Sequence, residues 1–497
     1  MKVVSIIGSG ISGLTTACYL AKAGYKVRIF EKNEEIGGRA RKFESHGFTF
    51  DMGPSWYWMP DIFEDFFNDF GKKVEDYYEL RRLDPSYSIY FEKQKIEIPA
   101  SYNEFVSLFE KFEPGSSLKL DQFFSDAAAK YKLGMKGFAT KPSLGIKEYA
   151  DPKLLKAAFK MNLFNNMDKH INKYFQHPYL RKIMQFPVIF LGAMPDKIPA
   201  MYSLMNYADT KLGTWYPMGG MFKIVESMAS LAEELGVEIN CGKEVVDFVI
   251  KKNIVTGICT NKGDFDTQVL VGSGDYHHIE SLLPNHKQSY SSGYWDKRKM
   301  APSCLIYYLG IGKKVSLDHH SLFFDSSFDQ HARELYDQPK WPSDPMFYVC
   351  TTSVTDASTA PENCTNLFIL VPIAAGLDGD TEQLRRKYKE KILERLEKRL
   401  GVEIRSQVIY ERSYSIRDFK EDYHAFKGNA YGLSNTLDQT AFLKPRMKSK
   451  KLKNLYYCGQ LTVPGPGVPP AIISGKIVAK EVIREHNTYS ENLKTIA

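Results

Sequence analysis

The hydrophobic pattern is clearest at the amino terminus, where short apolar runs flank a stretch with helical spacing. Val3–Ile7 is a β-branched apolar run, and an alanine-rich helical pattern follows from Ile11 to Gly24, a typical helix stop. Val27–Phe30 is a second apolar run of strand length. The pattern predicts a strand, a glycine turn, a helix and a second strand, which is how a parallel α/β unit begins.

Later segments show strand-like and helix-like patterns as well. Apolar or alternating runs predict strands at 87–91, 237–250, 254–260, 303–311, 366–374 and 455–458. Amphipathic spacing predicts helices at Phe222–Leu235, at 380–400 and from about Pro470 onward. The helix at 380–400 carries one apolar stripe among many charges, so we expect it on the outside of the protein.

Between about residues 100 and 205 the chain becomes rich in aromatic residues at helical spacing. We expect a mostly helical insertion here, interrupted by Pro187, Pro195 and Pro199. Such aromatic residues are core residues more often than ligand contacts, although as a group they could line an apolar tunnel. The aromatic residues in question are Phe159, Phe164, Tyr174, Phe175, Phe186, Phe190 and Tyr202.

The first glycine turn, Gly8-Ser9-Gly10-Ile11-Ser12-Gly13, has the spacing of a dinucleotide-binding loop. Gly8 permits the turn, Gly10 lets backbone N–H groups approach a pyrophosphate, and Gly13 lets the helix lie close to the strand. Phosphates would then lie at the helix N-terminus, which favours anions. Glu31 follows the second strand, where a carboxylate can accept hydrogen bonds from a ribose diol. Such an acid repels a 2′-phosphate, so the motif disfavours NADP.

A second glycine pair, Gly37-Gly38, precedes Arg39, and this favours FAD over NAD because a guanidinium beside exposed backbone suits a pyrophosphate. GSGISG, Glu31, GGRA at 37–40 and FDMGPS at 50–55 together resemble the amino-terminal signature of FAD-dependent amine oxidase-like flavoproteins. Within that superfamily the chain resembles the bacterial-type carotenoid desaturases, of which phytoene desaturase is the best known. The resemblance runs nearly from end to end.

The carboxyl-terminal segment is the second informative one. Leu455–Cys458 reads as a strand ending in a proline and glycine loop, and a new helix N-terminus follows near Pro470. In the resembling family this segment holds the pyrimidine side of the flavin. A helix N-terminus directed at that ring stabilises the negative charge that the flavin gains on reduction.

The resemblance implies FAD as cofactor and a set of binding residues. In the family a valine touches the adenine, and Val245 is the matching position, although a role in filling the core explains it almost equally well. The expected cofactor-binding residues are Gly8, Gly10, Ile11, Ser12, Gly13, Glu31, Lys32, Gly38, Arg39, Ala40, Gly53, Pro54, Ser55, Val245, Gly459, Gln460, Val468 and Pro469.

The expected fold class is α/β, with a Rossmann-type FAD-binding domain that is discontinuous in sequence and a mixed α+β substrate domain. The FAD-binding domain comprises 1–95, 206–300 and 411–497. The substrate domain, with its helical lid, comprises 96–205 and 301–410. A chain of 497 residues is long enough for two such units.

Composition excludes several other classes of protein. The 66 Lys and Arg against 59 Asp and Glu leave a net charge of +7, too modest to indicate nucleic-acid binding. The seven cysteines form no CxxC motif, and His277 and His278 have no carboxylate or cysteine spaced for a metal, so we expect no metal site. We expect no secretory leader and no membrane-spanning helix, and therefore a cytoplasmic location.

The resemblance implies that the enzyme removes hydrogens from a long apolar carotenoid, with phytoene converted towards lycopene as the leading expectation. Three alternatives stay open: a desaturase of a later, hydroxylated or γ-carotene-like carotenoid, a flavin amine oxidase, and a non-catalytic escort protein for isoprenoid lipids. Quinone or oxygen reoxidises the flavin in the family. Asp418 matches a recurring acid of the family, but the sequence assigns no catalytic base.

A carotenoid resides in the bilayer, so we expect the protein to contact the inner face of the membrane peripherally. Residues 443–454 are strongly basic and could lie against anionic headgroups, although a solvated loop is the simpler interpretation. The basic residues of this segment are Lys444, Arg446, Lys448, Lys450, Lys451 and Lys453.

Overall fold

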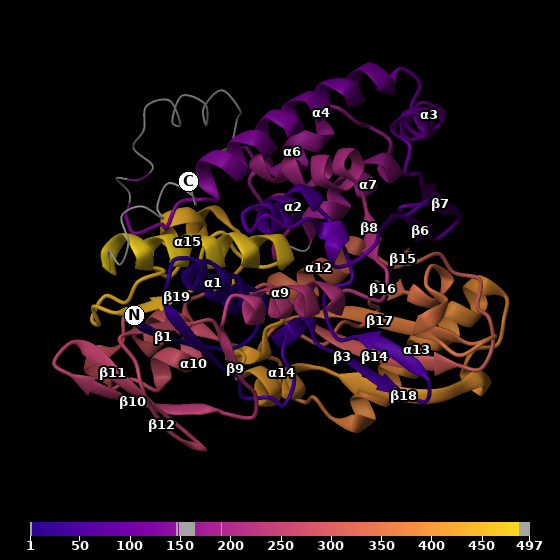
Figure 1. The fold of residues 1–497 in the computed structure, drawn as a ribbon. Coiled ribbons are helices and arrows are strands. Elements are labelled where there is room, and N and C mark those ends of the chain that lie inside the picture. Colours follow the sequence, from indigo (N-terminus) through magenta and orange to yellow (C-terminus); the bar gives the residue numbers. More distant parts are fainter. Residues whose placement is uncertain (1, 146–147, 149–164, 190, 487–497) are drawn as a thin grey trace.

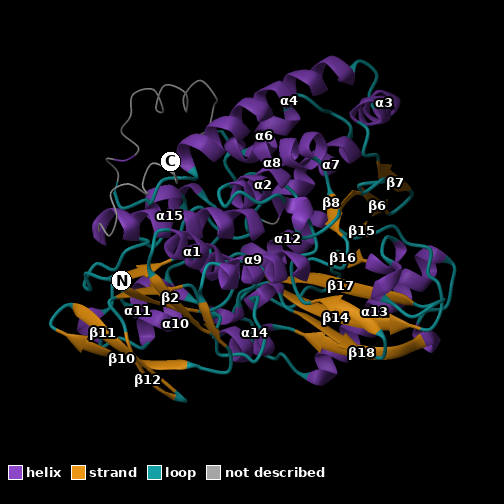
Figure 2. Cartoon of the chain, in the orientation of Figure 1, coloured by secondary structure: helices purple, strands orange, loops and turns teal. Residues whose placement is uncertain are grey.

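A computed structural model describes residues 2–145, 148, 165–189 and 191–486 of the chain. Figure 1 shows two sheets side by side, with helices of the first half of the chain lying across one of them as a separate layer. The expected α/β class is confirmed, and Figure 2 shows helices packed around both sheets.

The first sheet has five strands, in the order β19-β13-β1-β2-β9, and every neighbouring pair is parallel. Buried parallel strands need apolar residues on both faces, as the runs of this sheet have. Its strands are β1 (Val3–Ile7), β2 (Lys26–Phe30), β9 (Glu238–Asn240), β13 (Val269–Gly272) and β19 (Leu455–Tyr457). Segments near both ends of the chain therefore contribute strands to this sheet.

Both faces of the five-stranded sheet are covered. Helices α1 (Ile11–Lys22), α9 (Phe222–Glu234) and α15 (Val468–His486) share one core with alternate strand residues. The opposite face packs against α10 (Tyr276–Ser281) and a three-stranded antiparallel sheet. That sheet consists of β10 (Val245–Lys251), β11 (Ile254–Thr260) and β12 (Gly263–Asp266). The helices predicted at 222–235 and near Pro470 are confirmed.

The second sheet has seven strands in the order β18-β14-β17-β16-β15-β6-β7. All neighbours are antiparallel except β15 and β6. Helix α13 (Glu382–Leu400) covers one face with Tyr388, Ile392 and Leu396 buried, which confirms the predicted outer helix. The strands are β6 (Tyr87–Phe91), β7 (Lys95–Ile98), β14 (Ser303–Ile311), β15 (His320–Phe324), β16 (Phe347–Cys350), β17 (Thr365–Ile373) and β18 (Val408–Tyr414).

The other face of this sheet carries the helical layer, whose aromatic side chains form a second large core with it. The helices are α3 (Tyr102–Phe112), α4 (Ser116–Leu133), α6 (Met167–Asn172) and α7 (Pro178–Ile189). This confirms the predicted helical insertion for the described residues. Phe175 and Phe186 are core residues, whereas Phe159, Phe164 and Phe190 lie outside the described residues.

The remaining helices and strands connect these layers. They are β3 (Lys42–Ser45), β4 (Phe48–Asp51), α2 (Pro60–Asn68), β5 (Leu80–Arg82), α8 (Leu204–Asn206), β8 (Trp215–Pro217), α11 (Ser292–Asp296), α12 (Phe328–Tyr336) and α14 (Ile416–Tyr423). Strands β3 and β4 form a hairpin, and β5 pairs with β8.

One predicted strand pairs in a different sheet from the one expected. The strand at 87–91 was expected in the nucleotide unit of residues 1–95, but β6 runs parallel to β15, with Ile89 opposite Leu322. The boundary expected between 410 and 411 likewise falls inside β18. Apolar patterning indicates a strand without naming its partner. We propose that the first segment of the nucleotide unit ends before β6 and that its last segment begins after β18, while β9 and β13 belong to its middle segment.

Candidate functional site

The glycine turn connects β1 to α1 and leaves an open space at its centre. Gly8 has a φ of 98°, a value that favours glycine. A Cβ built at Gly13 would lie 2.3 Å from the Gly8 carbonyl oxygen, so only glycine lets α1 pack this close to the turn. A Cβ built at Gly10 would meet no atom within 4 Å. Helix α1 has no side-chain cap at Gly10, so its first N–H groups can receive a ligand.

Glu31 lies at the end of β2 and is buried, with 5% of its surface exposed. One carboxylate oxygen accepts hydrogen bonds from the backbone and the hydroxyl of Ser9 at 2.9 and 2.7 Å, inside the glycine turn. The other accepts from the backbone and the side chain of Asn33 at 2.9 and 3.0 Å. Glu31 therefore fixes the turn, and its place beside the turn fits the predicted ribose contact.

The GGRA segment folds back onto the same turn. Gly37 donates its N–H to the Ser9 carbonyl at 3.1 Å, and a Cβ at Gly38 would be 3.4 Å from the Gly10 Cα. Arg39 donates from Nη2 to the Asn429 carbonyl at 3.2 Å, and its buried Nε has no hydrogen-bond partner among the described residues. Burial lowers the pKa of Arg39. A buried guanidinium with a spare donor suits an anionic ligand.

The carboxyl-terminal segment meets the amino-terminal turn, as the sequence predicted. A Cβ at Gly459 would lie 3.3 Å from Ser12 Oγ, so the turn after β19 contacts the start of α1. The side-chain amide of Gln460 faces Arg39 and accepts from Nη2 at 3.0 Å in the amide orientation that satisfies both groups. Val468, which starts α15, is buried in the same core as Ile11. Thus three distant stretches of chain meet at one place.

Two other predicted positions flank the turn. Gly53 packs on the Arg39 backbone, since its Cβ would be 2.3 Å from the Arg39 carbonyl oxygen. Val245 is buried in β10, two residues after Lys243, whose N–H donates to the Glu31 carbonyl at 2.8 Å. Both roles proposed for Val245, adenine contact and core filling, agree with this location.

Three predicted positions have other roles in the structure. Lys32 directs its ammonium to the Glu421 carbonyl at the end of α14. Ala40 is a core residue, and Pro469 is half-buried within the first turn of α15. For all the predicted residues, the contact with FAD itself stays a prediction.

The residues that support Arg39 were not among the predicted positions. Tyr423 lies beneath its guanidinium, with 5.1 Å from Arg39 Cζ to the ring centroid. The Asp275 carboxylate favours the charged form of Arg39. It also caps α10 by accepting the His278 N–H at 3.2 Å. These partners come from 275 and 423–429, far from Arg39 in sequence, and no local pattern links them to it.

Beyond Ser55 the site borders a wall of aromatic side chains. Trp56 stacks on His320 with ring centroids 4.0 Å apart and contacts Phe186 at 5.3 Å. Tyr348 contacts His320 Nδ1 at 2.7 Å and donates to Ser55 Oγ at 3.0 Å. Burial lowers the pKa of His320 well below its usual range, so the ring is neutral. This wall is suited to an apolar ligand with few polar contacts.

Asp418 has a structural position. It accepts a hydrogen bond from Arg385 Nη2 at 2.6 Å and caps α14 by accepting the Ser415 N–H at 2.8 Å. Arg385 also pairs with Asp380 at 2.7 Å. The contacts of Asp418 therefore account for it without a catalytic role.

The sequence places no carboxylate or cysteine at metal-ligand spacing from His277 and His278, but the fold brings Glu244 and His424 close to His278. The expectation of no metal site stays a prediction. Glu244 lies 2.7 Å from His424 Nε2, and His424 stacks on His278 with ring centroids 3.8 Å apart. His319, His320 and Cys350 form a second group of possible metal ligands, and this group is buried. Sequence spacing alone did not indicate either group.

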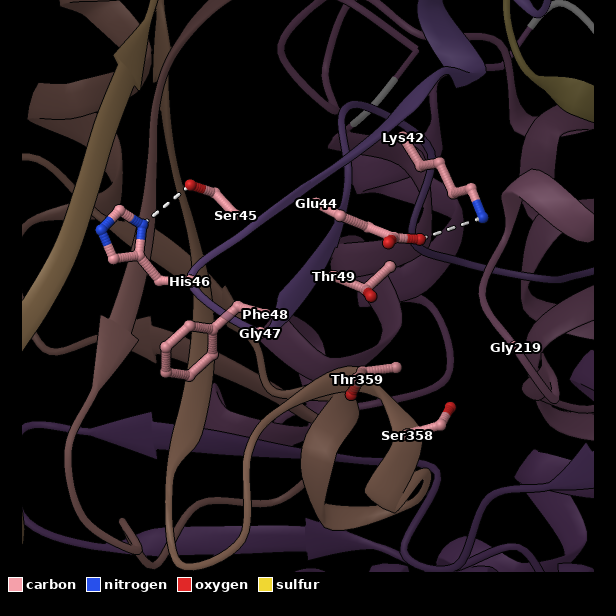
Figure 3. Close-up of a pocket in the computed structure, with 10 residues that line it drawn as sticks. All are labelled: Lys42, Glu44, Ser45, His46, Gly47, Phe48, Thr49, Gly219, Ser358 and Thr359. Atoms are coloured by element: carbon pink, nitrogen blue, oxygen red, sulfur yellow. Dashed lines mark hydrogen bonds and ion pairs between the residues drawn. The ribbon is translucent and has the colours of Figure 1, made fainter.

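The cavity shown in Figure 3 has a volume of about 500 Å³ and opens at the β3–β4 hairpin. Lys42 and Glu44 form an ion pair of 3.4 Å on its wall, and Ser358 and Thr359 add hydroxyl groups. None of the predicted cofactor residues lines it. This cavity is therefore separate from the site built around Gly10. Its polar wall also does not suit a hydrocarbon chain.

Comparison with known proteins identifies the family. A sequence profile described as flavin containing amine oxidoreductase matches residues 11–483. The chain belongs to this family. The carotenoid 3,4-desaturase of Haloarcula japonica is 41% identical over 490 residues, covering 97% of this chain and 98% of the relative. The 4,4′-diapophytoene desaturase (4,4′-diaponeurosporene-forming) of Staphylococcus haemolyticus is 30% identical, covering 97% of this chain and 99% of the relative.

A solved oxidoreductase from Methanosarcina mazei has the same fold, with a TM-score of 0.61 at 15% identity over 95% of this chain and 98% of that one. The resemblance to carotenoid desaturases is thus confirmed, and the chain is an FAD-dependent oxidoreductase. The open space at Gly10, the uncapped α1 and the spare donor of Arg39 fit that cofactor. Among the described helices, none combines the length and apolarity needed to cross a bilayer.

Proposed function

We propose that this flavoenzyme desaturates a long carotenoid. The observation that carries the proposal is the 41% identity with a carotenoid 3,4-desaturase over nearly the whole chain. FAD supplies the electron acceptor, since no side chain can take up a hydride. The protein supplies orientation and exclusion of water, through the turn at Gly10 and the aromatic wall beyond Ser55. The proton lost from the adjacent carbon passes to a carboxylate or to water.

For the substrate, we favour a later carotenoid over phytoene. The identity with the carotenoid 3,4-desaturase is 41%, against 30% with the diapophytoene desaturase. Phytoene, converted towards lycopene, was our leading expectation from sequence and is now the second candidate. The shape of the pocket determines which carotenoid fits, and the cofactor motif does not distinguish between them.

Anaerobic mixing of the purified holo-protein with each polyene tests both parts of the proposal. We expect a later acyclic carotenoid to bleach the oxidised flavin absorbance faster than phytoene does, and amines to leave it unchanged. Faster bleaching by phytoene would reverse the order of substrates. Bleaching by amines and by no polyene would identify an amine oxidase, and a protein that never binds a yellow chromophore would fit an escort protein.

We further propose a cytoplasmic enzyme that contacts the membrane surface and is reoxidised by quinone or oxygen. The structure changes the set of basic residues available for that contact, because Lys444 is buried and Lys448 pairs with Glu485. Phe442 and Leu443 are 37% and 41% exposed beside them, so apolar and basic groups are adjacent here.

Liposome flotation tests this contact. Exchanging Lys450, Lys451 and Lys453 for glutamine should weaken binding to vesicles that contain anionic lipid, while binding to neutral vesicles stays the same. Exchanging Leu443 for serine should weaken binding to both. Unchanged flotation of both variants would contradict the proposed surface.

A further inference from the structure

Lys444 differs from the other basic residues of segment 443–454 because it points into the protein. Only 2% of its surface is exposed, and its ammonium group has no hydrogen-bond partner among the described residues. Lys450, Lys451 and Lys453 of the same segment are exposed. A buried cation is costly unless an opposite charge or acceptor groups compensate it.

The ammonium of Lys444 faces the loop that precedes α15. Its Nζ lies 3.5 Å from the position that a Cβ on Gly465 would take, and Asn435 Oδ1 lies 3.3 Å from the same point. Asn435 Oδ1 also has no hydrogen-bond partner among the described residues. Gly465, with a φ of 138°, therefore leaves room for two polar groups against the backbone of this loop.

Two positive features thus meet in one place. The helix α15 starts at Val468, three residues after Gly465, and its 19 residues direct the positive end of their dipole towards the loop. Burial lowers the pKa of Lys444 to about 7, and no neighbouring acid in the described part of the chain opposes this. A lysine and a helix N-terminus do not stabilise each other. Their arrangement is favourable when an anionic group lies between or beside them.

We propose that Lys444 supplies the positive charge that balances the negative charge of reduced FAD at the pyrimidine ring. The inference rests on the proposed function and on the expectation, implied by the family resemblance, that the loop before α15 holds that ring. Negative charge on N1 and the C2 carbonyl would then be stabilised by one side-chain cation and by the α15 dipole together. Lys444 acts here as an electrostatic positioning residue, and the hydride transfer itself does not require it.

The midpoint potential of bound FAD tests the inference. Lys444→Met removes the charge with little change in length, and Lys444→Arg keeps the charge. Relative to the wild type, we expect the methionine variant to lose about tenfold in its affinity for reduced FAD over oxidised FAD. This corresponds to a fall of about 30 mV in the midpoint potential of the two-electron couple. The arginine variant and Lys398→Met, a matched change at an exposed lysine of α13, should stay within experimental error of the wild type.

The outcomes separate this inference from the proposed function. A methionine variant that binds FAD and desaturates its carotenoid at an unchanged potential overturns the role of Lys444 alone. Wild-type protein that binds no FAD overturns the function as well. If the methionine variant does not fold, the ¹⁵N signal of Lys444 in wild-type holoenzyme decides, assigned by its loss in Lys444→Arg. We expect an ammonium signal on reduction with dithionite, and a neutral amine in both redox states would contradict the inference.

Discussion

At the scale of single residues, Gly10 and Gly13 lie in the same turn but differ in what surrounds them. A Cβ at Gly10 meets nothing within 4 Å, whereas one at Gly13 meets the Gly8 carbonyl oxygen at 2.3 Å. Space that the protein leaves open beside helix N–H groups is available to a ligand. At Gly13 no such space exists, so this glycine is needed for the close packing of the helix on the turn. The two glycines therefore allow cofactor binding and folding to be tested separately.

Gly10→Val should fold but lose FAD, because the added methyl groups fill only the open space. The ratio of flavin to protein absorbance should fall at least tenfold, with a cooperative thermal transition retained. Gly13→Ala should instead destabilise the fold by about 1–3 kcal/mol, the usual cost of overpacking. Full flavin content in Gly10→Val would show that the pyrophosphate does not approach this turn.

Asp209 predicts a pH dependence of stability. It is buried, accepts hydrogen bonds from Tyr87 at 2.8 Å and Thr214 at 3.1 Å, and burial raises its pKa to about 7. Because the folded pKa exceeds the unfolded one, its contribution is full below about pH 4 and is lost as the pH rises through 7. Chemical unfolding of Asp209→Asn should therefore show a shallower fall in the free energy of unfolding between pH 4 and 7.

The matched control for this prediction is Asp329→Asn, at an exposed carboxylate. It should reproduce the wild-type slope. Equal slopes in all three proteins would mean that Asp209 stays ionised at low pH and that its burial carries no such cost.

Single-residue roles were predictable where backbone geometry dictates the residue type. The glycines of the first turn follow from the need for close approach, and Glu31 from its place after the second strand. The partners of Arg39 were not predictable, because Tyr423 and Asn429 reach it only through the tertiary fold. The sequence also could not show that Lys444 is the buried one of the six basic residues between 443 and 454. Burial along a loop does not repeat at a fixed spacing, as it does along a helix or a strand.

At the scale of elements, the packing of α1 against α15 joins the two ends of the chain. A Cβ at Gly475 would lie 2.6 Å from the Ser12 carbonyl oxygen, and Thr16 donates to the Gly475 carbonyl at 3.2 Å. Ser12 also belongs to the glycine turn. The distance between these helices thus determines the position of the turn relative to the loop before α15.

Gly475→Ala should destabilise the protein by about 1–3 kcal/mol although alanine favours helices, because the methyl group forces α15 away from α1. Thermal unfolding and flavin retention should fall together, since both depend on this contact. Gly293→Ala, at a helical glycine whose Cβ would meet nothing within 4 Å, should not lower the melting temperature. A Gly475→Ala variant as stable as the wild type would show that the two helices adjust freely.

Several helices and strands were predicted well because their apolar periods are local. The run predicted as one strand at 237–250, however, forms two strands, β9 and β10, in different sheets. The predicted ends differ from the observed ends by at most two residues for the strands at 303–311 and 366–374 and the helix at 380–400. Their partners were not found in the same way. Strand β6 pairs with β15, more than 200 residues later in the chain, and hydrophobic spacing carries no information about that pairing.

At the scale of the whole molecule, the five-stranded sheet takes its central strand from the amino terminus and an edge strand from residues 455–457. The predicted cofactor site lies where these distant segments meet, so a ligand bound there would contact segments from both ends of the chain. Ligands that bind only the folded state raise its stability by mass action. FAD is therefore expected to stabilise the entire fold, and not one local element.

Thermal unfolding of flavin-free protein at increasing FAD concentration tests this expectation. At a free concentration of one hundred times its Kd, FAD should add roughly 2.7 kcal/mol to the free energy of unfolding, with one cooperative transition throughout. NADP should add nothing measurable, because the buried Glu31 carboxylate beside the turn repels a 2′-phosphate. Two transitions, of which FAD raises only one, would show that the two sheets unfold independently and that the cofactor stabilises just one of them.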